Sequence, residues 1–362
     1  MMLKFTFVFL SFLPFILLLW LANVAEKRRA MSPQRHDVAV LVYALLSAMW
    51  LMVLSIGVFA ALLGVAYQRY ADIPTMLESY QAQGVDPELM LALMQSLPRL
   101  GAGLIVIALV GLAVLLPPVR RLLARVIPIS PTSVLHAVAL SYSVLIFINL
   151  WMVMGIGAET FLKMAQLEGA ENARSSDLIA FMWGQDLALA LMAFVGVGWL
   201  SRRGFRSAAR RLGLVWPSRQ DVVVGLGLAF GMFMVLIPVG FLMEKLGLGV
   251  DAEIEELIKV MIGPLFTSLP GILTLGLAAA LGEELVFRGA LQPRFGLFLT
   301  ALLFALTHSQ YVISSATLVV FLLGLLLGWV RIRRNTTTAM ILHASYNIAI
   351  GLISYLGAQL LK

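Results

Sequence analysis

Long apolar stretches separated by short polar loops constrain this 362-residue chain more than any other feature of its sequence. A helix needs about 20 consecutive apolar residues to cross the hydrocarbon core of a bilayer, and helices close all of their own backbone hydrogen bonds there. The sequence therefore predicts an all-α, polytopic integral membrane protein with about ten transmembrane helices. The predicted spans are 5–25, 38–66, 99–117, 133–157, 178–200, 221–246, 265–290, 296–313, 315–332 and 336–361.

Composition excludes several classes of function. Only 12% of the residues are charged, about half the fraction in an ordinary soluble domain. The net charge of +7 does not indicate nucleic-acid binding, because the basic residues alternate with apolar spans instead of covering one face. The chain has no cysteine, which excludes disulfides, thiolate metal sites and a cysteine nucleophile.

Loop charges predict the orientation in the membrane. Basic residues concentrate in the loops around 27–35, 120–125, 202–219, 288–294 and 331–334, whereas acidic residues occupy the alternate loops at 72–88, 159–177 and 244–256. Because short basic loops remain in the cytoplasm, the first set is predicted to be cytoplasmic and both termini to lie outside. The first span has the alternative reading of a cleaved signal peptide, but cleavage would leave Lys27 to Arg35 outside, so we expect an uncleaved helix.

The segment 201–220 is the clearest internal boundary, because it is strongly basic and then turns at Trp216 and Pro217. It predicts a five-helix membrane region of unknown role over 1–200, a basic cytoplasmic linker over 201–220 and a membrane core over 221–362. The linker is expected to be either a plain positively charged loop or a short amphipathic helix on the membrane surface.

Ionisable and amide side chains gather in the apolar spans of the C-terminal region. A charge within a span costs at least ~2.5–3.5 kcal/mol on insertion scales, so such residues usually have a function. The stretches GEELVFRG, FALTH and HASYN place these side chains on three of the predicted spans. The residues are Glu283, Glu284, Arg288, Phe304, His308, His343 and Asn347.

Spacing predicts how these side chains face. Glu284 and Arg288 are four residues apart and share a helix face, where they can pair, while Glu283 is turned about 100° away. Counting about 1.5 Å per residue places Glu283, His308 and His343 at similar depths in the cytoplasmic half of the membrane. The sequence therefore predicts one polar cavity lined by three helices.

Several chemistries fit such a cavity. A carboxylate in apolar surroundings can act as a general base on water, a histidine can hold that water, and His343 with Asn347 can donate to an oxyanion. Together these parts describe peptide hydrolysis. A metal-dependent version would use Glu283, His308 and His343 as ligands, although the HExxH pattern is absent. The alternatives are structural hydrogen bonds and ion pairs between helices, or a proton-coupled carrier.

Asp186, in WGQD, also lies within a predicted span. It is expected either to hydrogen-bond between packed helices or to line a second polar cavity.

The combined pattern EExxxR at 283–288, FxxxH at 304–308 and HxxxN at 343–347 resembles the CPBP family. This is the CAAX protease and bacteriocin-processing family of intramembrane proteases, which includes the eukaryotic Ras-converting CAAX endopeptidase. The resemblance covers about 215–360. It implies that Glu283 activates water with His308, that His343 and Asn347 form the oxyanion site, and that Glu284, Arg288 and Phe304 support them.

The resemblance favours a glutamate-dependent mechanism without a cofactor, with a divalent metal such as zinc as the alternative. The implied protein is an endopeptidase of a bacterial inner membrane that cuts a membrane-associated peptide or protein, which is sometimes lipidated in this family. Its expected partners are membrane lipids and this substrate, and not nucleic acid. The alternative function is a non-enzymatic scaffold or a ligand-binding or transport protein on the same fold.

Overall fold

The computed structural model describes residues 2–32, 34, 36–167 and 175–360, and within them the chain is helical with no β-strand. Arg35, Glu168 and Glu171, which contributed to the predicted loop charges, lie outside the described residues. The helices are α1 Met2–Ser11, α2 Leu13–Met31, α3 Asp37–Tyr70, α4 Ile73–Ala82, α5 Pro87–Ala113, α6 Pro117–Leu123, α7 Val134–Ile156, α8 Ala158–Leu167, α9 Ser175–Gly196, α10 Phe205–Leu212, α11 Arg219–Lys245, α12 Ala252–Ile262, η2 Gly263–Thr267, α13 Leu269–Glu284, η3 Leu285–Leu291, α14 Gln292–Leu306, η4 Ser309–Tyr311, α15 Ser315–Arg333 and α16 Thr336–Leu360.

Nine helical stretches of the described residues are long and apolar enough to cross a membrane, which confirms an all-α polytopic membrane protein. The number is nine and not ten because the predicted stretches 265–290 and 296–313 are counted together as Leu269–Leu306, although this segment is broken at Gly296. The third span is also longer than expected, since α5 already begins at Pro87 and carries Pro98 inside it.

The segment Leu269–Leu306 reverses its direction at Gly296. Gly296 has φ 78° and ψ 173°, a backbone conformation that is essentially restricted to glycine. Phe287 and Phe304 are seventeen residues apart and would be separated by about 26 Å along a straight helix. Their ring centroids are only 5.4 Å apart. The chain therefore returns antiparallel to itself after Gly296, and α14 packs back against η3.

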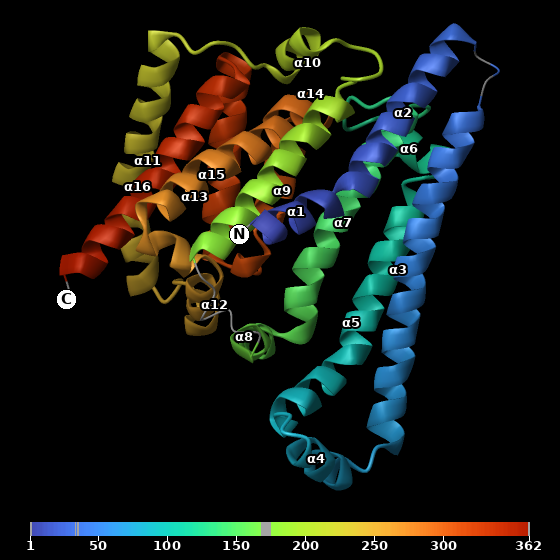
Figure 1. The fold of residues 1–362 in the computed structure, drawn as a ribbon, viewed down its shortest axis with the longest axis vertical. Helices are drawn as coiled ribbons and strands as arrows, with labels where there is room; N and C mark the ends of the chain where they lie inside the picture. The colour runs from blue at the N-terminus through green and yellow to red at the C-terminus, as the bar shows by residue number, and fades with distance from the viewer. Residues whose placement is uncertain (1, 33, 35, 168–174, 361–362) are drawn as a thin grey trace.

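The two ends of the molecule differ in charge. Figure 1 shows the basic elements α6 and α10 at one end of the helices, and α4, α8 and α12 at the opposite end. The first turn of α12 carries Glu253 and Glu255, and α10 ends with Arg210 and Arg211. The charges of the alternate loops are thus separated across the apolar layer, as the sequence predicts.

Helix α9 joins the N-terminal region to the C-terminal core. It packs on α13 and η3 and also on α1 and α2, whereas α3 and α5 form a long hairpin on the other side of α7 (Figure 1). The predicted linker is folded as well: α10 buries Ala208 and Leu212, and Thr336 Oγ1 donates to the Leu212 carbonyl at 2.5 Å. The two regions therefore share one packed core around α9 and α13.

A buried aspartate fixes the start of α16 beside α11. Asp221 accepts hydrogen bonds from the Ser218 backbone N–H at 2.9 Å and from Thr338 Oγ1 at 2.9 Å. The Ser218 side chain in turn accepts from the Asp221 backbone N–H, which completes a capping box for α11. Arg334 lies 3.6 Å from the same carboxylate. These contacts fix the register of α16, which carries His343 and Asn347.

Candidate active site

The paired glutamates lie where α13 changes into the π-helix η3. Ser268 caps the start of α13 by accepting from the Gly271 backbone N–H at 3.2 Å, and the α-helical geometry ends at Glu284. A π-turn inside a helix is often found at a functional site, because it re-aims the side chains around it. Here it follows the two glutamates directly and includes Arg288.

Glu284 and Arg288 form the predicted ion pair. Arg288 Nε lies 3.2 Å from Glu284 Oε2, and both side chains are almost completely buried. Arg288 Nη2 also donates to the Gly324 carbonyl at 3.4 Å, which ties η3 to α15. The pair is therefore part of the helix packing and faces away from open space.

His343 lies between the two glutamates. Its Nδ1 is 3.0 Å from Glu284 Oε1, and its Nε2 is 3.9 Å from Glu283 Oε2. Because the Glu284 carboxylate accepts, Nδ1 carries the proton and Nε2 is the nitrogen nearer Glu283. The Glu284–Arg288 pair thus sets the orientation of the His343 ring.

His308 lies just after α14 and not inside a helix. The predicted span 296–313 was too long, because α14 ends at Leu306 and the short 3₁₀ turn η4 follows. His308 Nδ1 is 3.0 Å from the Phe304 carbonyl. A carbonyl only accepts, so this bond places a proton on Nδ1 and leaves Nε2 free. The ring of Tyr311 stacks parallel on His308, with centroids 5.9 Å apart.

Phe304 is the packing centre of the site and is fully buried. Its ring meets the His308 ring at 5.0 Å and the His343 ring at 5.9 Å, both edge to face. The Arg288 guanidinium carbon lies 4.1 Å from its centroid. Phe304 therefore holds both histidines and the arginine in fixed positions around one apolar ring.

Asn347 is one helical turn beyond His343 on α16. Its Nδ2 donates to the Leu275 carbonyl of α13 at 3.1 Å, so one of its two amide N–H donors is already used. Asn347 and His343 both line the same cavity as Glu283 and His308. The structure thus brings all four predicted catalytic residues to one cavity, with Asn347 farther along its wall.

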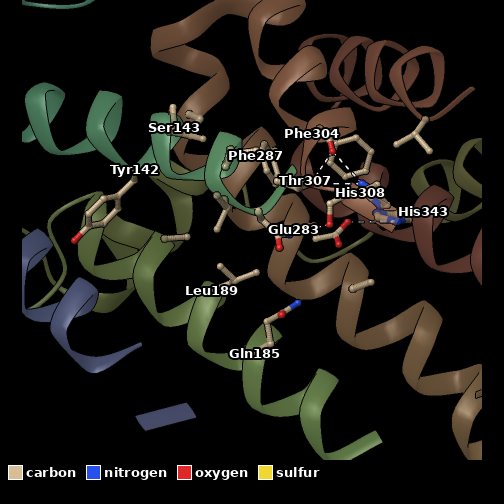
Figure 2. A pocket seen from close by; sticks show the side chains of 18 of the residues that line it. Tyr142, Ser143, Gln185, Leu189, Glu283, Phe287, Phe304, Thr307, His308 and His343 are labelled. Carbon is tan, nitrogen blue, oxygen red and sulfur yellow. Dashed lines mark hydrogen bonds and ion pairs between the residues drawn. The ribbon is translucent and has the colours of Figure 1, made fainter. Parts of the chain in front are cut away.

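Glu283 is the glutamate that faces open space. Its side chain keeps 18% of its accessible surface, and its buried Oε2 atom has no hydrogen-bond partner among the described residues. It lines a cavity of about 1950 Å³. Figure 2 shows Glu283, His308 and His343 together on the wall, with Gln185 and Leu189 of α9 across from them. A carboxylate that lines a cavity without a hydrogen-bond partner is a site for a water molecule or a polar ligand.

The residues do not fit the three-ligand metal site that the sequence left open. Within the described part of the chain, no three His, Asp or Glu side chains converge closely enough to hold an ion. We therefore assign no step of a reaction to a metal.

Asp186, which the sequence singled out, and two residues that it did not, Tyr311 and Asn149, complete the surroundings. Asp186 of α9 is 1% exposed, and neither of its oxygens has a hydrogen-bond partner among the described residues, so the predicted interhelical bond is not seen. A Cβ atom built on Gly282 would lie 2.5 Å from Asp186 Oδ1, so this carboxylate packs directly beside the Glu283 turn. Tyr311 and Asn149, which donates to Ser309 Oγ at 2.9 Å, support His308.

Comparison with known families agrees with this geometry. Residues 265–349 match the family model described as Type II CAAX prenyl endopeptidase Rce1-like. This segment of the chain is Rce1-like. The match contains all seven residues that the sequence singled out, from Glu283 to Asn347, and it covers η2 through most of α16. The family is one of membrane proteases of the CAAX endopeptidase type.

One curated protein shares a short segment with this chain. The chain is 40% identical over 67 residues to an uncharacterized protein, YpbD, from Bacillus subtilis strain 168. This similarity covers 17% of the chain and 35% of the relative, so the chain spans about a third of the length of the curated protein it matches. No solved structure matches the chain.

Proposed function

We propose that this protein is an intramembrane endopeptidase that hydrolyses a membrane-associated peptide or protein with a water molecule activated by Glu283. The observation that carries the proposal is the Glu283 carboxylate, which lines a large cavity beside His343 within the Rce1-like segment and has no hydrogen-bond partner among the described residues. A carboxylate that has no partner can hold a water molecule and accept its proton.

The proposed reaction begins with that water between Glu283 and the scissile carbonyl. Glu283 takes one proton as the water oxygen bonds to the carbonyl carbon, and the carbonyl oxygen becomes an oxyanion. His308, with its free Nε2, accepts a hydrogen bond from the second hydrogen of the water, which stays on the water oxygen. The proton on Glu283 then passes to the leaving amine as the peptide bond breaks.

The oxyanion is assigned to His343 and Asn347. Asn347 retains one amide N–H beyond its bond to Leu275. Since His343 donates through Nδ1 to Glu284, donation from Nε2 requires the imidazolium form. Its Nε2 is the ring nitrogen on the side of Glu283 and the cavity. The Glu284–Arg288 pair then acts as a positioning pair for His343.

The proposed location is a bacterial inner membrane, with the basic end of the helices in the cytoplasm and both termini outside. The charge difference between the two ends of the molecule supports this orientation. The cavity around Glu283 and His308 is proposed to open to this cytoplasmic side, and the arginines that also line it support that side.

The experiment is cleavage of a prenylated CAAX-type reporter peptide and of membrane-protein extracts by purified protein in detergent. Glu283→Ala and His308→Ala are compared with wild type, each with and without a chelator. We expect both variants to lose at least about 100-fold in rate, and the chelator to leave wild type active. Chelator-sensitive cleavage would instead support metal chemistry. A folded wild type that cuts nothing, together with uptake into vesicles that Glu283→Gln stops, would favour a carrier.

A further inference from the structure

The cavity that contains Glu283 has a second, strongly basic wall. Five arginines line it at the end where α10 and the start of α14 lie together in Figure 1. They come from α2, from the segment before α10, from α10 itself and from α14. The five are Arg29, Arg202, Arg203, Arg211 and Arg294.

Four of these arginines are fixed by neutral groups. Arg29 donates to the Thr132 carbonyl at 2.7 Å, Arg202 to Asn23 Oδ1 at 2.5 Å, and Arg211 to the Gly289 carbonyl at 3.3 Å. Arg203 donates to the Val197 carbonyl. Each guanidinium has five N–H donors, so most of the donors are left for another partner.

Their positive charge is not balanced within the protein. In the part of the chain that the structure describes, none of the five forms an ion pair with a carboxylate. Glu26 is the one acidic residue lining this end of the cavity, and it accepts instead from Ser133 Oγ at 2.7 Å. Burial and the nearby positive charges of Arg294, Arg203 and Arg331 lower the pKa of Arg211. Like charges crowded around one cavity favour the entry of an anion.

We infer that the arginine wall binds an anionic group of the substrate, so that the enzyme selects peptides with acidic side chains on the cytoplasmic side of the cut. The inference rests on the proposed function, because the same cavity connects the arginines to Glu283. Arg294 is eleven residues after Glu283 on the η3–α14 segment, which corresponds to about 16 Å. An extended peptide covers that distance in about four to five residues. The acidic residues therefore lie about that far from the scissile bond.

The ordinary explanation for arginines here is the positive-inside rule. It accounts for Arg206 and Arg210, which lie on the outer face of α10 and line a separate shallow hollow. It does not account for five guanidinium groups from four segments that line one cavity. Arg206 therefore serves as the matched control for Arg294, since both are exposed arginines of the same end.

The test is binding of a fluorescent apolar peptide that ends in two aspartates, compared with the same peptide ending in two asparagines. The protein is full-length Glu283→Gln in phosphatidylcholine nanodiscs, so that nothing is cut. We expect the aspartate peptide to bind about tenfold more tightly, Arg294→Gln to remove most of the difference, and Arg206→Gln to keep it. Arg294→Lys, which retains the charge, should restore part of the preference.

Equal binding of the two peptides would overturn the inference. So would a preference that Arg294→Gln and Arg206→Gln reduce equally. If inorganic phosphate or phosphatidylglycerol binds in an Arg294-dependent manner while the aspartate peptide shows no preference, the wall binds phosphate groups or lipid and not substrate. The binding test does not depend on cleavage. If the protein prefers the aspartate peptide but wild type cuts no peptide, the arginine site is supported and the proposed function is rejected.

Discussion

His343 contacts two adjacent glutamates in different ways, with its Nδ1 at 3.0 Å from Glu284 and its Nε2 at 3.9 Å from Glu283. Glu284 is fully buried and paired with Arg288, whereas Glu283 faces the cavity with an unpaired oxygen. Two neighbouring residues of the same type therefore have separate roles: one positions the histidine, and the other is free to react.

This difference predicts that the two alanine variants lose very different amounts of folding stability. Glu284→Ala removes one member of a buried ion pair and leaves Arg288 uncompensated, which costs about 3–5 kcal/mol of folding stability. Glu283→Ala removes no ion pair of that kind and should change stability by less than about 1 kcal/mol. Thermal unfolding in detergent measures both. Equal destabilisation by the two variants would contradict the separate roles.

Gly296 provides the second prediction. No atom lies within 4 Å of a Cβ built on it, so Gly296→Ala would test the backbone conformation alone. Because its φ and ψ are essentially restricted to glycine, the variant should lose about 1–3 kcal/mol of stability and displace His308 from Glu283. The rate of peptide cleavage is then expected to fall as well, because His308 is displaced.

Gly227→Ala is the control for this prediction. Gly227 is in α11, where a Cβ also meets no atom and the backbone is helical. Alanine should be tolerated there or be slightly stabilising, because it is the better helix former. If Gly296→Ala behaves like Gly227→Ala in both stability and cleavage, the reversal at Gly296 does not position the site.

The contact between α9 and α13 gives a third prediction. In Gly282→Ala the new methyl group would lie 2.5 Å from Asp186 Oδ1 and 2.8 Å from the Asp186 Cα atom, so the helices must move apart. Overpacking of this kind costs about 1–3 kcal/mol. Since Glu283 is the next residue, we also expect cleavage to fall. The matched variant Gly231→Ala on α11, where a Cβ meets no atom, should lower neither the stability nor the rate of cleavage.

Asp186 itself should be replaceable. A buried carboxylate with no partner is unfavourable, so Asp186→Asn is expected to maintain or raise thermal stability. A drop of several degrees in the unfolding temperature would show that Asp186 has a stabilising partner in the membrane. If cleavage falls while stability is kept, Asp186 influences Glu283 electrostatically.

Sequence reasoning predicted which side chains gather at one cavity better than it predicted their backbone. The apolar runs identify the spans because the bilayer requires them, and counting residues from the loops places Glu283 and His343 at one depth. The prediction for His308 had the right depth but the wrong structure, since α14 ends at Leu306. Thr307 and His308, the last two residues of FALTH, follow the helix, but nothing in the composition of this stretch distinguishes them from helical residues.

Other features depend on tertiary contacts that a sequence pattern does not contain. A single glycine in QPRFGLF does not indicate a reversal, because the sign of its φ is set by how α14 packs on η3. The π-helix after Glu284 and the packing of Asp186 on Gly282 are equally absent from the hydropathy pattern. The division at 201–220 suggested two separate regions, and it gave no sign that α9 would pack against α13.

The central claim is that Glu283 activates water and does not bond to the substrate. The most direct measurement is single-turnover cleavage of a reporter peptide in oxygen-18 water, followed by mass spectrometry of product and protein. The account predicts one oxygen-18 atom in the new carboxyl group of the product, none in Glu283, and no cleavage by Glu283→Ala. Label incorporated into the Glu283 carboxylate would mean a covalent intermediate, and cleavage by Glu283→Ala at the wild-type rate would mean that another group activates the water.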